Sequence, residues 1–374
     1  MLNILLRTLR WVGALLLGVL FSPLVIMYTC CSRRSTRARS PTAAPATYTD
    51  PRWGEHVTYD LPRGVKLHCV ESGPATAPIL LCVHGFPENW YSWRQWLRAF
   101  SSSHRVVAVD MRGFGESPEP NATWCGSRRA AGREHVNDLA DLVALLVRKR
   151  AALLGAGTSE KCVTVAAHDW GGVLAWLLVP ILAARGQLSH FIVMDAPHPA
   201  VYSKSASVAQ LMKSLYIVHF QVPMLPEWYL SRDDFAAIGS MFLGKKVGVK
   251  KGGKYVLSPA DVDVYKWALK RPGSLTAQLN LYRQVFDLTH EDFRTLAAGV
   301  GGHPPLDAPT LIVWGSEDGA LGPELARGHE RFAKDVRVEV MDGASHWVQQ
   351  DATVEVIQQV ARFLNVKADL QRLI

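Results

Sequence analysis

Short, uninterrupted apolar runs recur along the chain, separated by longer segments in which apolar residues have a helical spacing. Such runs are typical of strands covered on both faces, as in a parallel sheet. One separating segment, residues 136–149, has apolar residues at 136, 139, 142, 143, 145 and 146, which is a helical period. We therefore expect strands at residues 57–59, 65–71, 78–83, 105–110, 162–166, 191–194, 309–314 and 336–341, and a last amphipathic helix at 353–364.

The alternation of strands and helices predicts an α/β fold, a mostly parallel sheet flanked by helices through right-handed crossovers. Between about residues 199 and 302 this alternation gives way to aromatic-rich helical segments. We interpret this stretch as a helical lid that is inserted over the functional site. The globular domain, lid included, is expected to span residues 53–374.

The N-terminal region has a different pattern. Residues 11–29 form an uncharged apolar run of about the length that crosses a bilayer. A signal peptide is the alternative, but its apolar core is shorter and a small-residue cleavage site should follow it. Here Cys30, Cys31 and an arginine cluster follow instead. We predict an uncleaved membrane anchor, one transmembrane helix, at residues 1–31, and a flexible stalk rich in Ser, Thr, Ala, Pro and Arg at 32–52.

The charges that flank this run favour one orientation. Four arginines follow it, whereas two arginines and the amino terminus precede it. The positive-inside rule then favours a cytosolic globular domain on a single-pass protein of the endoplasmic reticulum. A glycosylation sequon at Asn121 is usable only if the domain faces the lumen. Cys30 and Cys31 lie at the end of the apolar run, where palmitoylation can occur.

The net charge of +8 is local rather than spread over the chain. The first 40 residues hold six arginines and no acidic residue, which leaves a net charge of +2 for the rest. Nothing in this distribution indicates a nucleic-acid partner. The six cysteines have no metal-ligand spacing and imply no disulfide framework. No cofactor and no metal are expected.

The chemistry centres on the hexapeptide Ala167-His168-Asp169-Trp170-Gly171-Gly172, which follows the expected strand at 162–166. Small residues around a central acid fit the nucleophile elbow, a sharp strand-to-helix turn, with Asp in place of Ser. The positive end of the following helix helps to keep such a carboxylate ionised. An ionised Asp169 can attack carbon and form an ester. The alternative is a structural corner with a surface Asp.

A second motif, His84-Gly85-Phe86-Pro87, ends the expected strand at 78–83. A turn in this position can aim backbone N–H groups at a developing oxyanion. The expected donors are the backbone N–H groups of Phe86 and Trp170, and His84 and Pro87 are expected to contact the substrate. A loop with a hydrogen-bonded histidine is the alternative.

Two further strand-end residues complete a hydrolytic set. His346 follows the last expected strand, where a general base that activates water belongs. Asp318 follows the strand at 309–314 and can fix the tautomer of the imidazole, while Glu317 is the weaker candidate. The order Asp169, Asp318, His346 is the nucleophile, acid, base order of α/β hydrolases.

The lid contributes Tyr216 and Tyr282. Tyrosines in lids are usually packing residues. Above a carboxylate nucleophile, however, their hydroxyls can bind a substrate oxygen and donate a proton as a C–O bond breaks.

Together these motifs resemble the epoxide hydrolases of the α/β-hydrolase fold over most of residues 53–364. With the N-terminal anchor, the sequence looks closest to their membrane-anchored type 3 and type 4 branch. The resemblance implies Asp169 as nucleophile, Asp318 and His346 as charge relay, and Tyr216 and Tyr282 as donors to the ring oxygen. It is carried by residues 84–87, 168–172, 195–199, 220–227 and 345–347 and by the two lid tyrosines.

Three positions depart from the family pattern. Ala167 replaces a glycine, His219 replaces a residue that is often aromatic, and residues 121–133 are unusually polar and rich in arginine. None of these changes removes a catalytic group.

The expected function is therefore that of an epoxide hydrolase, which converts lipophilic, fatty-acid-derived epoxides and water to vicinal diols. A haloalkane dehalogenase forms the same ester on an Asp elbow but needs halide-binding N–H donors rather than a tyrosine pair. A non-catalytic, membrane-tethered binding module on the same fold is the third interpretation.

Overall fold

The computed structural model describes residues 13, 16–23, 43–118, 131–155, 161–205, 207–250, 257–284 and 304–373. Within these ranges an eight-stranded sheet has the order β1-β2-β4-β3-β5-β6-β7-β8. The β1–β2 and β2–β4 pairs are antiparallel and all other neighbours are parallel, which confirms the predicted mostly parallel sheet. The strands are β1 (Glu55–Leu61), β2 (Val65–Ser72), β3 (Ile79–Val83), β4 (Arg105–Val109), β5 (Val163–His168), β6 (Leu188–Met194), β7 (Thr310–Gly315) and β8 (Val336–Met341).

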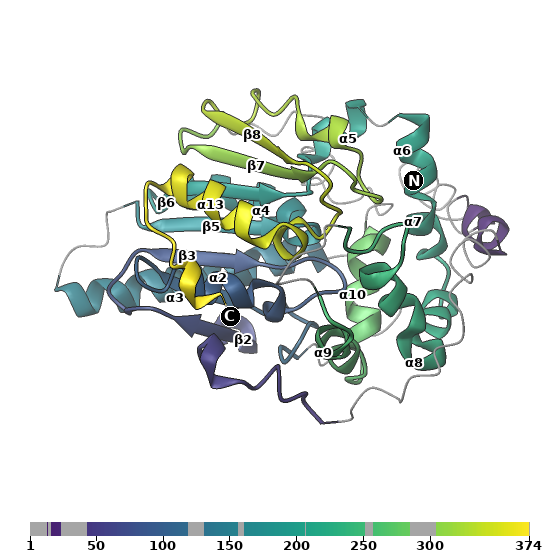
Figure 1. Cartoon of the computed structure of the whole chain (residues 1–374), viewed down its shortest axis with the longest axis horizontal. Coiled ribbons are helices and arrows are strands. Elements are labelled where there is room, and N and C mark those ends of the chain that lie inside the picture. Colours follow the sequence, from purple (N-terminus) through teal and green to yellow (C-terminus); the bar gives the residue numbers. More distant parts are fainter. Residues whose placement is uncertain are drawn as a thin grey trace.

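Helices flank this sheet (Figure 1). Helix α3 (Ala131–Leu154) packs against α4 (Trp170–Ala184), and α2 (Arg94–Ala99) packs against α13 (Thr353–Leu364). Every residue of β3, β4 and β5 is buried, which explains why these strands are almost entirely apolar. The short helix α12 (Val348–Asp351) follows β8 and precedes α13.

The segment between β6 and β7 carries the lid helices. Figure 1 shows α6 to α10, in teal and green, gathered at one end of the sheet. Helix α8 is kinked, because residues 232–235 leave helical geometry and three of them have positive φ angles. The lid helices are α5 (Pro199–Ser205), α6 (Val208–Lys213), α7 (Leu215–His219), α8 (Leu225–Leu243), α9 (Pro259–Leu269) and α10 (Ser274–Arg283).

Residues 43–52 correct the prediction of a flexible stalk at 32–52. Tyr48 is fully buried, and its ring lies 5.1 Å from that of Trp90 and 4.8 Å from that of Trp267. Burying an aromatic ring stabilises this segment against the domain, an effect that the polar composition of the stretch conceals. Residues 32–42 lie outside the described residues.

The prediction of an N-terminal anchor also falls largely outside the described residues, since only residue 13 and the helical residues 16–23 are described there. In this part, Ser22 is buried and its Oγ lies 2.7 Å from Nδ1 of His219 in the lid. Among the described residues, no helix combines the length and the apolar character needed to cross a bilayer. Cys30, Cys31 and Asn121 lie outside the described residues.

Candidate active site

Asp169 occupies a sharp turn between β5 and α4. Its backbone has φ 49° and ψ −124°, and it is the N-cap of α4. Non-glycine residues rarely adopt such angles, and strained positions of this kind cluster at functional sites. The first turn of α4 requires glycine at position 171, because a Cβ there would lie 2.4 Å from the carbonyl oxygen of His84. The close approach of α4 to the end of β3 therefore holds the Asp169 side chain above the sheet.

The Asp169 carboxylate lies between a backbone donor and an imidazole. The backbone N–H of Phe86 donates to Oδ1 over 2.8 Å, and Nε2 of His346 lies 3.4 Å from Oδ2. Burial alone would raise the pKa of Asp169, but the hydrogen bond and charge of His346 lower it below its usual value. Trp170 is the first residue of α4, so its backbone N–H belongs to the unpaired group at a helix start.

His346 is held by Asp318. The two come from the segments after β8 and β7, and Nδ1 of His346 lies 2.8 Å from Oδ2 of Asp318. The other oxygen, Oδ1 of Asp318, accepts backbone N–H donors from Ala320 and Leu321 over 2.7 and 2.8 Å. Glu317, the weaker sequence candidate, is 57 % exposed and its carboxylate lies 4.0 Å from Nζ of Lys250.

The charges around His346 change its acidity. Burial alone would lower the pKa of His346, but Asp318 and then Asp169 raise it well above its usual value. The imidazole therefore favours its protonated form while both carboxylates are charged. Together, Asp169, His346 and Asp318 form a continuous chain of ionisable groups at the carboxyl ends of three parallel strands.

Tyr216 of α7 and Tyr282 of α10 lie together over this chain of groups. Their ring centroids are 5.8 Å apart, and the Tyr282 ring packs edge-on against Trp170 at 5.0 Å and Phe86 at 5.2 Å. Burial, followed by the charge of Asp169, raises the pKa of Tyr216, and burial likewise raises that of Tyr282. Both hydroxyls therefore stay protonated at neutral pH and are able to donate.

His84 does not face the substrate side, which corrects its expected role. Its Nε2 accepts the backbone N–H of Met111 over 3.1 Å, and its Nδ1 lies 2.9 Å from the carbonyl oxygen of Gly85. With both ring nitrogens bound to backbone, the fully buried His84 holds two loops together. Pro87 is buried and follows a cis peptide bond from Phe86.

Glu88 and His168 link the Phe86 loop to His346. No role for either residue was predicted from the sequence. Oε2 of Glu88 lies 2.8 Å from Nδ1 of His168, and Nε2 of His168 lies 2.7 Å from the backbone oxygen of His346. Oε1 of Glu88 accepts from the side chains of Gln349 and Gln350 over 3.0 and 2.7 Å. Glu88 and His168 thus connect the Phe86 loop to the backbone of His346.

Asp195 is a third residue to which the sequence assigned no role. It follows β6 with a φ of 44°, is fully buried, and accepts the backbone N–H of Gly315 over 2.8 Å. Burial and then the charge of Asp318 raise the pKa of Asp195 well above its usual value. The direct carboxylate partner of the His346 ring is Asp318, 2.8 Å from Nδ1. The signal in the sequence was its position at a strand end, in the motif at residues 195–199.

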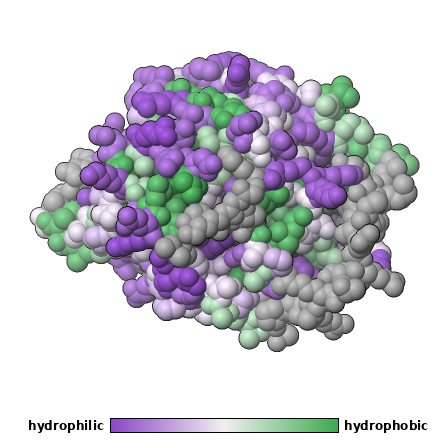
Figure 2. All heavy atoms as spheres, viewed as in Figure 1, coloured by the Kyte–Doolittle hydropathy of each residue, from purple (hydrophilic) through white to green (hydrophobic). Residues whose placement is uncertain are grey.

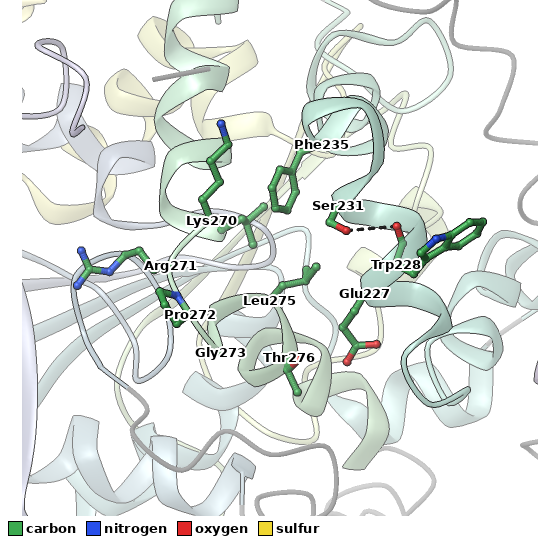
Figure 3. Close-up of a pocket in the computed structure, with 11 residues that line it drawn as sticks. Glu227, Trp228, Ser231, Phe235, Lys270, Arg271, Pro272, Gly273, Leu275 and Thr276 are labelled. Carbon is green, nitrogen blue, oxygen red and sulfur yellow. Dashed lines mark hydrogen bonds between the residues drawn. The ribbon is translucent and has the colours of Figure 1, made fainter. Parts of the chain in front are cut away.

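A hollow of about 450 Å³ lies within the lid, between α8 and the α9–α10 turn (Figure 3). Glu227 on its wall pairs with Arg283, the neighbour of Tyr282, over 2.8 Å. This ion pair fixes the end of α10 against α8. The residues that line the hollow are Glu227, Trp228, Ser231, Phe235, Leu269, Lys270, Arg271, Pro272, Gly273, Leu275 and Thr276.

Comparison with known proteins gives consistent matches. Residues 78–353 match the family described as alpha/beta hydrolase fold. The chain is 34% identical to epoxide hydrolase 4 of Mus musculus over 323 residues, 85% of this chain and 81% of that relative. It is 35% identical to epoxide hydrolase 3 of Xenopus tropicalis over 328 residues, 86% and 81% of the two chains. Among solved structures, the Bacillus megaterium epoxide hydrolase with an inhibitor has a TM-score of 0.65 and 25% identity, covering 83% of this chain and 100% of that one.

Proposed function

Because the chain belongs to the epoxide hydrolases of the α/β-hydrolase fold, we propose that it opens lipophilic epoxides to vicinal diols through an ester on Asp169. The observation that carries this proposal is the Asp169 carboxylate, which has His346 on one side and lies near the paired rings of Tyr216 and Tyr282, whose pKa values are raised by burial and also by its charge. A nucleophile, a base and two proton donors thus meet at one point.

In the first half-reaction, a carboxylate oxygen of Asp169 attacks an epoxide carbon and the C–O bond of the ring breaks. Tyr216 and Tyr282 hydrogen-bond the ring oxygen, which takes up a proton as it leaves carbon. The product of this step is a hydroxyalkyl ester on Asp169.

The second half-reaction follows from the change in charge at Asp169. Esterification removes one of the two negative charges that raise the pKa of His346. The pKa of His346 then falls, and the proton that it releases restores the tyrosine hydroxyl. Neutral His346, oriented by Asp318, takes a proton from water, which attacks the ester carbonyl.

The resulting oxyanion is close to the Phe86 N–H, which already donates to Oδ1 of Asp169 over 2.8 Å. The Trp170 N–H is the proposed second donor. Collapse of the tetrahedral intermediate breaks the acyl C–O bond, and the diol oxygen receives its proton from His346. The carboxylic acid left on Asp169 then returns a proton to His346, which restores the starting state. No cofactor takes part in this sequence.

The aromatic surroundings support a lipophilic substrate. The ring of Tyr282 packs edge-on against Phe86, Trp170 and Phe220. Such a wall favours apolar chains on either side of the epoxide and offers few groups to a polar substrate. Fatty-acid-derived epoxides fit this chemistry.

The N-terminal apolar run at residues 11–29 supports a further part of the proposal, a single-pass anchor in the endoplasmic reticulum with the globular domain in the cytosol. Carbonate-resistant membrane association of the full chain, without glycan on Asn121, is the expected result. Release by carbonate, or a glycan on Asn121, would contradict the anchor or its orientation respectively.

A single turnover in ¹⁸O-water tests the ester, with full-length enzyme in excess over a lipophilic epoxide. The diol should form with unlabelled oxygen, and the label should enter the peptide that contains Asp169. Direct labelling of the diol would mean that water attacks the ring, and the role of Asp169 would be wrong. Release of halide from haloalkanes, without any diol from epoxides, would identify a dehalogenase. Binding without turnover of either class would identify a binding module.

A further inference from the structure

We propose that His56, His68 and Glu116 form a binding site for a divalent transition-metal ion, with Zn²⁺ as the best fit. The three side chains belong to the β1–β2 edge of the sheet and the segment after β4, and none of them takes part in the proposed ester chemistry. Their donor atoms Nδ1, Nε2 and a carboxylate oxygen lie within 4.8 Å of one another. Two imidazoles and one carboxylate are a common ligand set for zinc.

The backbone brings the two histidines to one face of the sheet. Strands β1 and β2 are antiparallel, and the register pairs Thr58 with His68 and His56 with Val70. His56 and His68 are therefore diagonal neighbours, two residues apart, and diagonal neighbours on one face are within reach of long side chains. Their ring centroids are 5.0 Å apart.

The segment that carries Glu116 is attached to the same strand. The backbone N–H of Asp110 donates to the carbonyl oxygen of His68 over 2.9 Å. The backbone N–H of His68 donates in turn to Oγ of Ser117 over 2.9 Å. Because backbone groups join β2 to both ends of this segment, Glu116 is held beside His68 without any ion.

Two of the three distances between the donor atoms are close to those around a tetrahedral ion, and the third is within 4.8 Å. Nδ1 of His56 lies 2.9 Å from Nε2 of His68, which lies 3.4 Å from Oε2 of Glu116. Zinc bonds of about 2.0 Å in a tetrahedron require donor atoms roughly 3.3 Å apart. Small rotations of side chains are therefore sufficient to admit the ion, with water as a fourth ligand.

A second observation independently points to a metal ligand, namely the partner of the other His68 nitrogen. Nδ1 of His68 lies 2.8 Å from Oδ2 of the fully buried Asp110. Asp110 is itself fixed by the backbone N–H groups of Trp90 and Glu116 over 2.8 and 2.9 Å. A carboxylate that accepts from one ring nitrogen places the lone pair on the other, the arrangement found behind metal-binding histidines.

The charges facing the site favour a cation. Asp110 and Glu116 bring two carboxylates, and the opposing charge is Arg271, whose Nη1 lies 4.0 Å from Oε1 of Glu116. Without an ion, the same atoms form a hydrogen-bonded imidazole pair, which the metal replaces.

No pattern in the sequence indicates this site, because its three ligands are separated by 12 and 48 positions. An ion bound by all three ligands would join the edge hairpin β1–β2 to the segment after β4. We infer a structural role, and the expected consequence is a higher melting temperature of the occupied protein.

Calorimetry of the full-length protein in detergent, stripped of metal with a chelator, tests the proposal with Zn²⁺, and visible absorption tests it with Co²⁺. One ion per chain should bind and raise the melting temperature. His56→Gln and Glu116→Gln should each weaken binding at least tenfold and abolish the thermal shift. His190→Gln is the matched control, since His190 is a part-buried strand histidine whose Nδ1 lies 2.8 Å from the hydroxyl of Ser189. It should bind as the wild type does.

Two results would overturn the proposal. One is no binding at micromolar Zn²⁺ by wild-type protein that retains epoxide hydrolysis. The other is binding that both variants leave unchanged. His168, Asp195 and His346 also have donor atoms within 4.8 Å of one another. Zinc bound at those three residues would inhibit turnover, and His56→Gln would not weaken its binding. This is a case of the second result.

Discussion

The strand-end residues and the lid tyrosines lie a few ångströms apart, but they are held in different ways. Asp169 accepts the backbone N–H of Phe86 and Asp318 accepts that of Leu321, while the backbone oxygen of His346 lies 2.7 Å from Nε2 of His168. Tyr216 and Tyr282, in contrast, are positioned mainly by edge-on ring contacts on short helices.

This difference shows how the fold divides the chemistry. Groups that form and hydrolyse the ester need a fixed geometry, and hydrogen bonds at the ends of parallel strands provide it. Groups that donate a proton to a variable substrate are carried by elements that can repack around it. Substitutions at the strand ends should therefore lower kcat more than substitutions in the lid do, and they should stop the reaction at a defined step.

The largest effect is expected for His346→Gln. The first half-reaction remains possible because Asp169 is intact, but no base is left to activate water. We expect kcat to fall by roughly four orders of magnitude, while intact-mass analysis detects an ester on Asp169. Glu317→Gln is the matched control, because this exposed neighbour of Asp318 does not contact the imidazole. Loss of turnover without any ester would show that His346 acts before or during ring opening.

The lid side of the comparison is tested by Tyr216→Phe and Tyr282→Phe. Either hydroxyl alone can still bind the ring oxygen, so each single variant should lose about tenfold in kcat. The double variant should lose on the order of 10² to 10³, the range of general acid catalysis. The slowed step should be ester formation, which single-turnover kinetics measures.

Tyr202→Phe is the control for the tyrosine variants, since its hydroxyl lies 2.8 Å from Oγ of Ser214 in the same lid. If kcat fell as far in the double variant as in His346→Gln, the distinction between the strand ends and the lid would be removed. Full activity of the double variant would show that the tyrosines only pack.

A smaller effect is expected at Glu88, which touches neither substrate nor reacting atoms and acts through His168. Glu88→Gln weakens the bond to His168 and so loosens the backbone oxygen of His346. We expect kcat to fall by up to about 10², with ester hydrolysis slowed more than ester formation. Glu71→Gln is the control, because Glu71 also belongs to a part-buried ion pair, with Arg105 at 2.7 Å. Equal slowing of both steps would mean that Glu88 has only a structural role.

The same contrast explains what the sequence was able to predict. Strand ends follow from unbroken apolar runs, so the positions of Asp169, Asp318 and His346 at one sheet edge were predictable. The direction of a side chain within a loop does not follow from such a pattern. His84 was therefore expected at the substrate, although both of its ring nitrogens bind backbone.

Residues that act through long-range contacts were missed for a related reason. Glu88 and His168 are separated by 80 positions, and nothing local to either shows that they meet. Tyr48 is similar, since its burial against Trp267 of the lid becomes apparent only once the lid has folded over the sheet. Local composition there predicted a stalk.

The smallest effect concerns pH, and it belongs to the strand-end region alone. The pKa of His346 is raised in the folded protein, so its contribution to stability is complete below the unfolded value of about 6.5 and is lost as pH rises through the folded value. The pKa of Asp169 is lowered, so its contribution is present above about pH 4 and is lost only in acid.

The free energy of unfolding should therefore decline above pH 6.5 in the wild type, and less steeply in His346→Gln. Denaturant titrations between pH 6 and 9 measure this difference, and the Tyr216→Phe, Tyr282→Phe double variant should keep the wild-type slope. If its slope flattened as much as that of His346→Gln, lid and strand ends would be one coupled electrostatic unit rather than two regions with separate roles.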